Sequence, residues 1–132
     1  MTQLSKEHVK LIQAKNFGFL ATANKDGSPQ VSPVWIDTDG EFLLINTAIG
    51  RVKERNTRRD PRVGIAIADQ SDPYSWILVR GRVTEWIEGP EAEAHIDKLS
   101  KKYTGRAKFV KNDPNERRVI FKILPEKIGD RS

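Results

Sequence analysis

Arginine and lysine side chains gather in one short segment of the 132-residue chain, "GRVKERNTRRDPR", at residues 50–62. The segment holds six basic and two acidic residues, a net charge of +4 out of the chain's +5. Charge that is confined to one segment indicates a local anion site rather than a generally basic protein. The basic residues are Arg51, Lys53, Arg55, Arg58, Arg59 and Arg62.

The basic segment is predicted to form a helix over residues 50–60, because good helix formers fill it and Pro61 ends it. Spacings of four, three and four residues place one set of arginines on a single face: Arg51, Arg55, Arg58 and Arg62. Lys53 points to another side. The first N–H groups of a helix have no intrahelical partner, so residues 50–53 offer an anion backbone donors together with side-chain charge. Arg51 and Lys53 are therefore the candidate phosphate-binding side chains.

Two other interpretations of the basic segment remain open. The arginines can form an ordinary solvated helix face, with Glu54 paired to Arg58 four residues later, and we expect this role for Arg58, Arg59 and Arg62. A basic stripe can also bind the phosphate backbone of a nucleic acid. The three tryptophans are spread over three predicted strands and form no stacking motif, which gives nucleic-acid binding little support.

Composition limits the remaining chemistry. With 37% hydrophobic residues, the chain is predicted to fold as one domain over residues 1–132. Cysteine is absent, which excludes disulfides and thiolate metal sites. The isolated His8 and His95 form no metal-binding spacing, so we expect structural roles for both and no metal site. The sequence contains no apolar run near the ~20 residues of a membrane span and no signal peptide, so a cytoplasmic protein without membrane contact is expected.

Strands dominate the elements that must position the basic segment. Alternating apolar residues and turn signals predict six strands, at about residues 17–24, 30–37, 41–47, 62–70, 74–88 and 116–128. Asp-Gly turns join the first three, which are expected to form a three-stranded meander. Pro33 lies inside the second strand and indicates a bulge or a sheet edge there.

Helices are predicted at three places. A short leading helix covers residues 4–15 with Ser5 as its N-cap, and the basic helix follows the third strand. The third helix begins at Pro90, which suits a first helical turn, and ends at Gly105. We therefore predict an α+β protein that is mainly β, a six-stranded antiparallel barrel decorated by helices.

Four motifs in order carry a family resemblance over about residues 17–123. They are "GFLATANKDGSPQVSPVWID", "GEFLLINTAIGRVKERNTRRDPRVGIAI", "PYSWILVRGRVTEW" and "IDKLSKKYTG". Together they resemble the split β-barrel flavin and deazaflavin oxidoreductases related to pyridoxamine 5′-phosphate oxidase. Within that family, "RVKERNTRRDPR" is most similar to the small oxidoreductases that use the deazaflavin coenzyme F420.

The resemblance implies an FMN-binding type of split barrel, a homodimer, and a phosphate-bearing cofactor in the grooves between subunits. Coenzyme F420 is the first choice and FMN the second. One subunit would supply most phosphate contacts and the other would close over the ring. By position, the implied cofactor-binding residues are Gln30, Val31, Ser32, Pro33 and Val34 along the ring, Thr47, Ala48, Arg51 and Lys53 near the phosphate, and Tyr74, Ser75 and Trp76 from the facing subunit.

The implied activity is hydride transfer to or from a small conjugated substrate, with the cofactor supplying the difficult chemistry. No catalytic residue is identified. The chain ends at Ser132 without the substrate-binding extension of true pyridoxamine phosphate oxidases, so we do not expect that activity. The alternatives are a non-catalytic flavin- or haem-binding module and, with less support, a basic nucleic-acid-binding protein.

Overall fold

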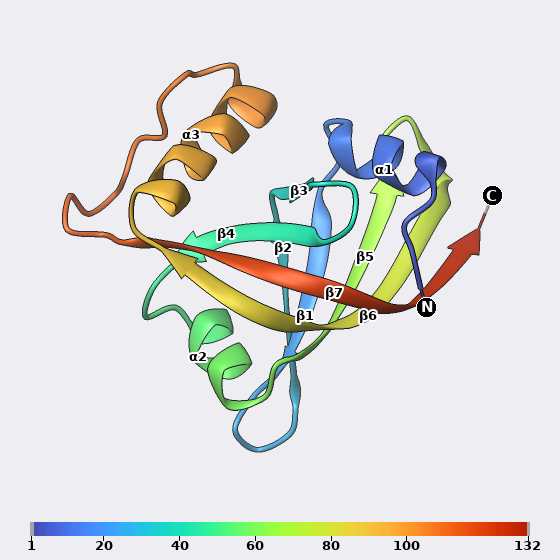
Figure 1. Cartoon of the computed structure of the whole chain (residues 1–132), viewed down its shortest axis with the longest axis horizontal. Helices are drawn as coiled ribbons and strands as arrows, with labels where there is room; N and C mark the ends of the chain where they lie inside the picture. The colour runs from blue at the N-terminus through green and yellow to red at the C-terminus, as the bar shows by residue number, and fades with distance from the viewer. Residues whose placement is uncertain (1, 132) are drawn as a thin grey trace.

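The computed structural model describes residues 2–131, whose strands form one antiparallel sheet that curls into a half-barrel (Figure 1). The strands are β1 (Gly18–Ala23), β2 (Pro29–Val34), β3 (Ile36–Thr38), β4 (Leu43–Ala48), β5 (Arg62–Asp69), β6 (Asp72–Glu88) and β7 (Arg118–Arg131). Their order across the sheet is β2-β1-β5-β6-β7-β4-β3. The helices of this part of the chain are α1 (Lys6–Gln13), α2 (Val52–Arg59) and α3 (Pro90–Thr104).

The structure corrects the predicted strand at residues 30–37 and the meander that was built on it. The segment divides at Trp35 into β2 and β3, which lie on opposite edges of the sheet. Pro33 has no N–H for a continuous ladder, and the backbone N–H of Ile36 donates to the Tyr103 hydroxyl at 3.1 Å. The described residues therefore form seven strands and not six, whereas the mainly antiparallel α+β class is confirmed.

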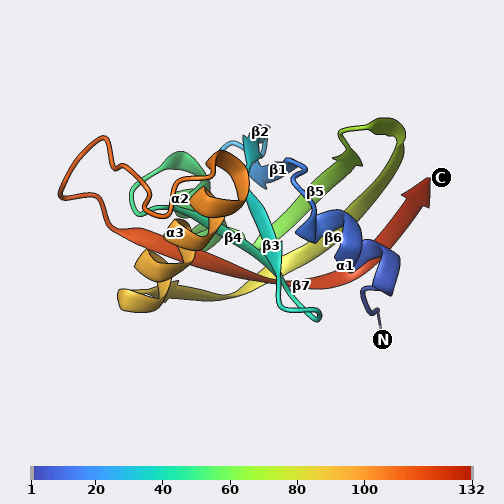
Figure 2. The same ribbon diagram turned by 90° about the horizontal axis from the view of Figure 1, so that it is seen from above.

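The hydrophobic core lies inside the curled sheet, and β6 and β7 are middle strands of that sheet. Val79 of β6 and Phe121 and Ile123 of β7 are fully buried there. In Figures 1 and 2, α3 lies beside the start of β7 and α1 lies toward its other end. A smaller cluster forms where Leu99 and Tyr103 of α3 pack with their neighbours. The helices therefore cover the sheet at separate places (Figures 1 and 2).

The helix ends agree with the signals in the sequence. Ser5 caps α1, and its Oγ accepts a hydrogen bond from the backbone N–H of His8 at 3.1 Å. Pro90 begins α3, and Gly105 ends it in the left-handed conformation at φ 82°. None of the helices in residues 2–131 has the length and apolar character that a membrane crossing requires.

Lys102 of α3 connects two segments that are distant in sequence, and it makes stability depend on pH. Its Nζ donates to the carbonyl oxygens of Ile12 and Ile36 at 2.7 Å each. Burial, assisted by the nearby Lys98 charge and opposed by that of Asp37, lowers the pKa of Lys102 to about 8 from 10.5. Between these values the unfolded chain binds more protons, so the free energy of unfolding rises with pH.

Denaturant unfolding of the wild type and Lys102→Met between pH 8 and 9.5 measures this effect. The wild type should become more stable as pH rises, because the cost of burying the charged ammonium disappears. In the variant, the free energy of unfolding should rise less steeply with pH. Subtracting the variant's slope from that of the wild type removes the contribution of the other titrating groups. Equal slopes in the two proteins would show that Lys102 titrates as an exposed lysine.

Candidate functional site

A cleft of about 220 Å³ lies where α2 follows β4, between that helix, the crossing from β2 to β3, α3 and the start of β7. The structure brings together five of the twelve residues implied as cofactor contacts. These are Pro33, Val34, Thr47, Arg51 and Lys53. Residues implied near the ring and residues implied near the phosphate therefore meet in one cavity of a single subunit.

The N-terminus of α2 opens onto this cleft. Arg51 is the N-cap residue, and its side chain makes no capping hydrogen bond. Gly50 adopts φ 96°, which permits the sharp turn out of β4, and its N–H donates to Glu54 Oε1 at 2.9 Å. The N–H of Arg51 donates to the Ala48 carbonyl oxygen at 3.3 Å, whereas the N–H groups of Val52 and Lys53 have no intrahelical acceptor and lie at the positive end of the helix dipole. This terminus therefore suits an anion that Arg51 and Lys53 also reach.

Positive charge exceeds negative charge in the cleft. Glu116 accepts a hydrogen bond from Arg118 Nη1 at 2.9 Å, and its other oxygen lies 3.5 Å from Arg51 Nη2. No carboxylate within residues 2–131 forms an ion pair with Lys53. Burial and the charges of Arg51 and Arg118 lower the pKa of Lys53. A phosphate in the cleft would offset this repulsion and favour the charged form of the lysine.

A buried hydroxyl without a partner also marks the cleft. Thr47 is 1% exposed, and its Oγ1 has no hydrogen-bond partner in the described part of the chain. Buried polar atoms of native proteins are nearly always hydrogen-bonded, so a ligand atom is the natural partner of this hydroxyl. The side chains present thus fit a phosphate-bearing cofactor.

Aromatic rings form another part of the lining. The rings of Trp35 and Phe109 meet edge to face, with centroids 6.0 Å apart. Trp35 also stacks on Tyr103 at 5.3 Å, with only 6° between the planes. Planar aromatic surfaces of this kind pack well against a conjugated ring. The cleft can therefore hold an anionic group and a ring system that are parts of one ligand.

The other seven implied residues do not line the cleft. Gln30, Val31 and Ser32 lie on the edge strand β2, and Ala48 is buried at the end of β4. Buried oxygens of Gln30 and Ser32 have no partner within the described residues. Tyr74 is exposed, whereas Ser75 and Trp76 line a separate hollow beside α1. Residues 74–76 therefore lie away from the cleft of their own subunit.

Three of the four remaining arginines of the basic segment have partners outside the cleft. Arg58 Nε donates to Glu54 Oε2 at 2.8 Å, which confirms the predicted pair. Arg59 donates to the carbonyl oxygen of Ala23, and Arg62 forms an ion pair with Asp60. These three arginines therefore make surface interactions around α2, which is the role that the sequence predicted for them.

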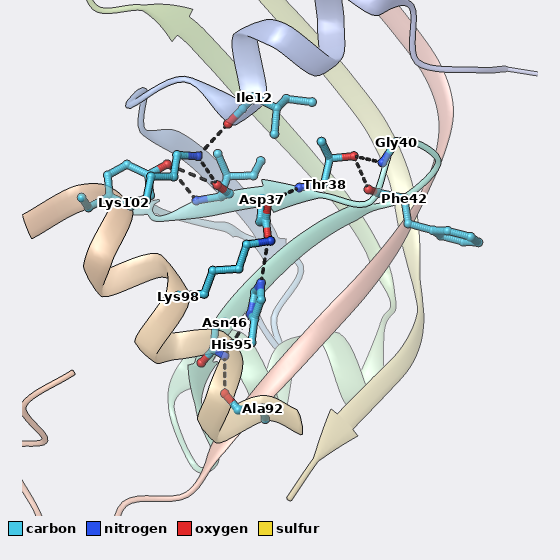
Figure 3. Close-up of polar contacts among 12 residues, drawn as sticks. Ile12, Asp37, Thr38, Gly40, Phe42, Asn46, Ala92, His95, Lys98 and Lys102 are labelled. Carbon is cyan, nitrogen blue, oxygen red and sulfur yellow. Dashed lines mark hydrogen bonds and ion pairs between the residues drawn. The ribbon is translucent and has the colours of Figure 1, made fainter. Parts of the chain in front are cut away.

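A buried chain of polar side chains runs from β3 to the cleft (Figure 3). His95 Nε2 lies 3.1 Å from Asp37 Oδ2, and His95 Nδ1 lies 3.2 Å from Asn46 Nδ2. Asn46 Nδ2 is a donor, so Nδ1 must accept and Nε2 must carry the proton. Burial opposes the charge of Asp37, but hydrogen bonds from His95, Thr38 and Lys98 outweigh it and hold the Asp37 pKa well below its usual value.

Asn46 and Arg118 are site residues that reasoning from sequence missed. Asn46 Oδ1 accepts a hydrogen bond from Arg118 Nε at 2.9 Å, and both residues line the cleft. The sequence did contain a signal for both residues. Asn46 directly follows the apolar run "LLI", and Arg118 directly precedes the apolar run "VIF". Strands with such runs are covered on both faces, where a polar side chain needs a specific partner.

Comparison with known proteins identifies the family of the chain. The family model described as pyridoxamine 5′-phosphate oxidase matches residues 4–132. A solved F420 reductase is 31% identical with a TM-score of 0.79, over 91% of this chain and 94% of its own. A conserved hypothetical protein from Mycobacterium tuberculosis has 23% identity and a TM-score of 0.76, covering 100% and 90% of the two chains, and supports the fold alone. The chain belongs to the pyridoxamine 5′-phosphate oxidase-like family of split-barrel flavin and F420 oxidoreductases.

Proposed function

We propose that the protein binds a phosphate-bearing flavin-type cofactor in this cleft and transfers hydride to or from a small conjugated substrate. The observation that carries the proposal is the unpartnered Thr47 hydroxyl in a cleft with excess positive charge at a helix N-terminus. The bound cofactor supplies the hydride chemistry. The chain's own part is to bind and orient that cofactor, with Thr47, Arg51 and Lys53 holding the phosphate.

Coenzyme F420 is the first choice of cofactor and FMN the second. Similarity to an F420 reductase at 31% identity over 91% of the chain supports this order. Pro33 and Val34 would lie along the ring, close to the aromatic surface of Trp35. Both cofactors combine a planar ring with a phosphate, so the basic and aromatic parts of the cleft suit either one.

We further propose a homodimer, in which Tyr74, Ser75 and Trp76 of the partner subunit approach the cofactor ring. An apolar stripe crosses the outer face of four adjacent strands. Its residues are paired in register from edge to centre: Pro33, Phe19, Ala66 and Leu78. Phe19 is 47% exposed and Leu78 is 44% exposed, which is typical of a surface that a second subunit covers.

Titration of the purified protein with F420, FMN and riboflavin tests the proposal, with cofactor fluorescence as the readout. F420 or FMN should bind at micromolar concentration or tighter, and riboflavin, which has no phosphate, should bind more weakly. Reduction of the bound cofactor by a candidate hydride donor then distinguishes an oxidoreductase from a non-catalytic binding module. Failure of both F420 and FMN to bind would refute the proposed function.

A further inference from the structure

We propose that Arg118 is an additional phosphate-binding residue of the cleft and that Asn46 and His95 are positioning residues that orient it. The inference rests on the proposed function, and it names residues that neither the sequence motifs nor the family resemblance supplied. Arg118 is the first residue of β7, far along the chain from the basic segment of α2. The sheet brings the two together, because Arg118 pairs in register with Ala48 at the end of β4.

The guanidinium of Arg118 is buried in the cleft with donors to spare. Arg118 is 4% exposed. Its Nε and Nη1 donate to Asn46 Oδ1 and Glu116 Oε2 at 2.9 Å each, and Nη2 lies at the limiting distance of 3.5 Å from the Asn46 carbonyl oxygen. A guanidinium has five N–H groups, and no other acceptor contacts them within residues 2–131. A phosphate oxygen in the cleft is a suitable partner for the remaining donors.

The charges around Arg118 favour a ligand that carries negative charge. Arg51, Lys53 and Arg118 line one cleft, and Glu116 is shared between the two arginines. Glu93 accepts from the backbone N–H of Arg118 at 2.9 Å and forms its ion pair with Lys111 rather than with the guanidinium. The three cations thus exceed the one carboxylate by two charges, an excess that favours an anionic phosphate ligand.

The orientation of Arg118 is set by the amide of Asn46. Asn46 Nδ2 donates to the carbonyl oxygen of Ala92 at 2.9 Å and to His95 Nδ1 at 3.2 Å, as Figure 3 shows. Both donors of the amide are used, so its oxygen must face Arg118. A reversed amide would oppose two donors, Asn46 Nδ2 and Arg118 Nε. His95 is held in turn by Asp37, so the chain orients the guanidinium before any ligand arrives.

A purely structural role for Arg118 is the competing explanation. Its guanidinium carbon lies 4.9 Å from the centroid of the Phe109 ring and thereby ties the segment after α3 to the sheet. If that contact is its whole role, loss of Arg118 should weaken binding of cofactors with and without phosphate alike. If Arg118 binds phosphate, its replacement should weaken binding of the phosphate-bearing cofactor and not of the phosphate-free one. The ratio of the two affinities separates these roles.

The test compares the wild type with Arg118→Met and Arg118→Lys in titrations with FMN and riboflavin, and with F420 and its phosphate-free deazaflavin core. Arg118→Met should bind the phosphate-bearing cofactor about tenfold or more weakly and the phosphate-free ring almost unchanged. Arg118→Lys keeps the charge, so its affinity for the phosphate-bearing cofactor should lie between those of the wild type and Arg118→Met. This variant provides the test if Arg118→Met does not fold. Arg55→Met is the control, because Arg55 is exposed and lies outside the cleft.

Asn46→Leu tests the positioning role through non-additivity. The single variant should lose about threefold or more in affinity for the phosphate-bearing cofactor, and the loss should vanish in the Arg118→Met background. If the affinity losses of Asn46→Leu and Arg118→Met add in the double variant, the inference is wrong. It is also wrong if Arg118→Met binds FMN and F420 as the wild type does. Either result leaves the proposed function standing. A wild type that binds neither cofactor would refute the proposed function itself.

Discussion

Lys53→Ala should weaken binding of the phosphate-bearing cofactor by about 1.5 to 3 kcal/mol, the contribution of a charge-assisted hydrogen bond. Lys53 is a half-buried ammonium in the cleft, and no carboxylate of residues 2–131 forms an ion pair with it. Its loss should leave the fold largely intact, because the repulsion from Arg51 and Arg118 disappears with it. Arg51→Ala should have an effect of the same size. Isothermal titration with F420 and FMN measures both.

Arg58→Ala and Arg59→Ala are the matched controls on the same helix. Both side chains have protein partners outside the cleft, so each replacement should change cofactor affinity much less than Lys53→Ala. Thermal unfolding of every variant establishes that the comparison is between folded proteins. Equal losses from all four replacements would indicate a diffuse basic surface, as in nucleic-acid binding, and would contradict a discrete phosphate site.

Leu78→Asp should convert the proposed dimer into a monomer and weaken cofactor binding at the same time. Leu78 is exposed on β6 beside Ala66, in the apolar stripe across the outer face of the sheet. A carboxylate placed in that interface without a partner costs several kcal/mol, roughly a hundredfold or more in dimer affinity. Cofactor binding should fall as well, because residues 74–76 of the partner subunit would no longer reach the ring. Sedimentation velocity and cofactor titration measure the two effects.

Val110→Asp is the control for this experiment. Val110 is also an exposed apolar residue, at 68%, but it lies in the segment between α3 and β7 and outside the stripe. It should leave the association state unchanged. A wild type that sediments as a monomer at cofactor-binding concentrations, or a Leu78→Asp protein that remains dimeric, would contradict the proposed interface.

Local interactions explain what the sequence determined about this protein. Ser5, Pro90 and Gly105 mark helix ends because caps depend on neighbouring residues alone, and each occupies the position that its chemistry predicts. Alternating apolar residues likewise located β5 and the long β6, since strand periodicity is a property of a single segment. The position of Arg51 and Lys53 at the start of the basic helix was predictable too, because the N-cap and the first turn of a helix are set by neighbouring residues, and both side chains line the cleft.

Contacts between distant segments decided the rest. The division of residues 29–38 at Trp35 depends on which strand each half pairs with, because β2 pairs with β1 at one side of the sheet and β3 pairs with β4 at the other. Arg118 enters the cleft through the pairing of β7 with β4, and Asn46 orients it only because α3 places His95 beside the amide. Local propensity carries no information on such pairings, so the basic helix was readable from the chain, whereas the buried side chains around it required the tertiary structure.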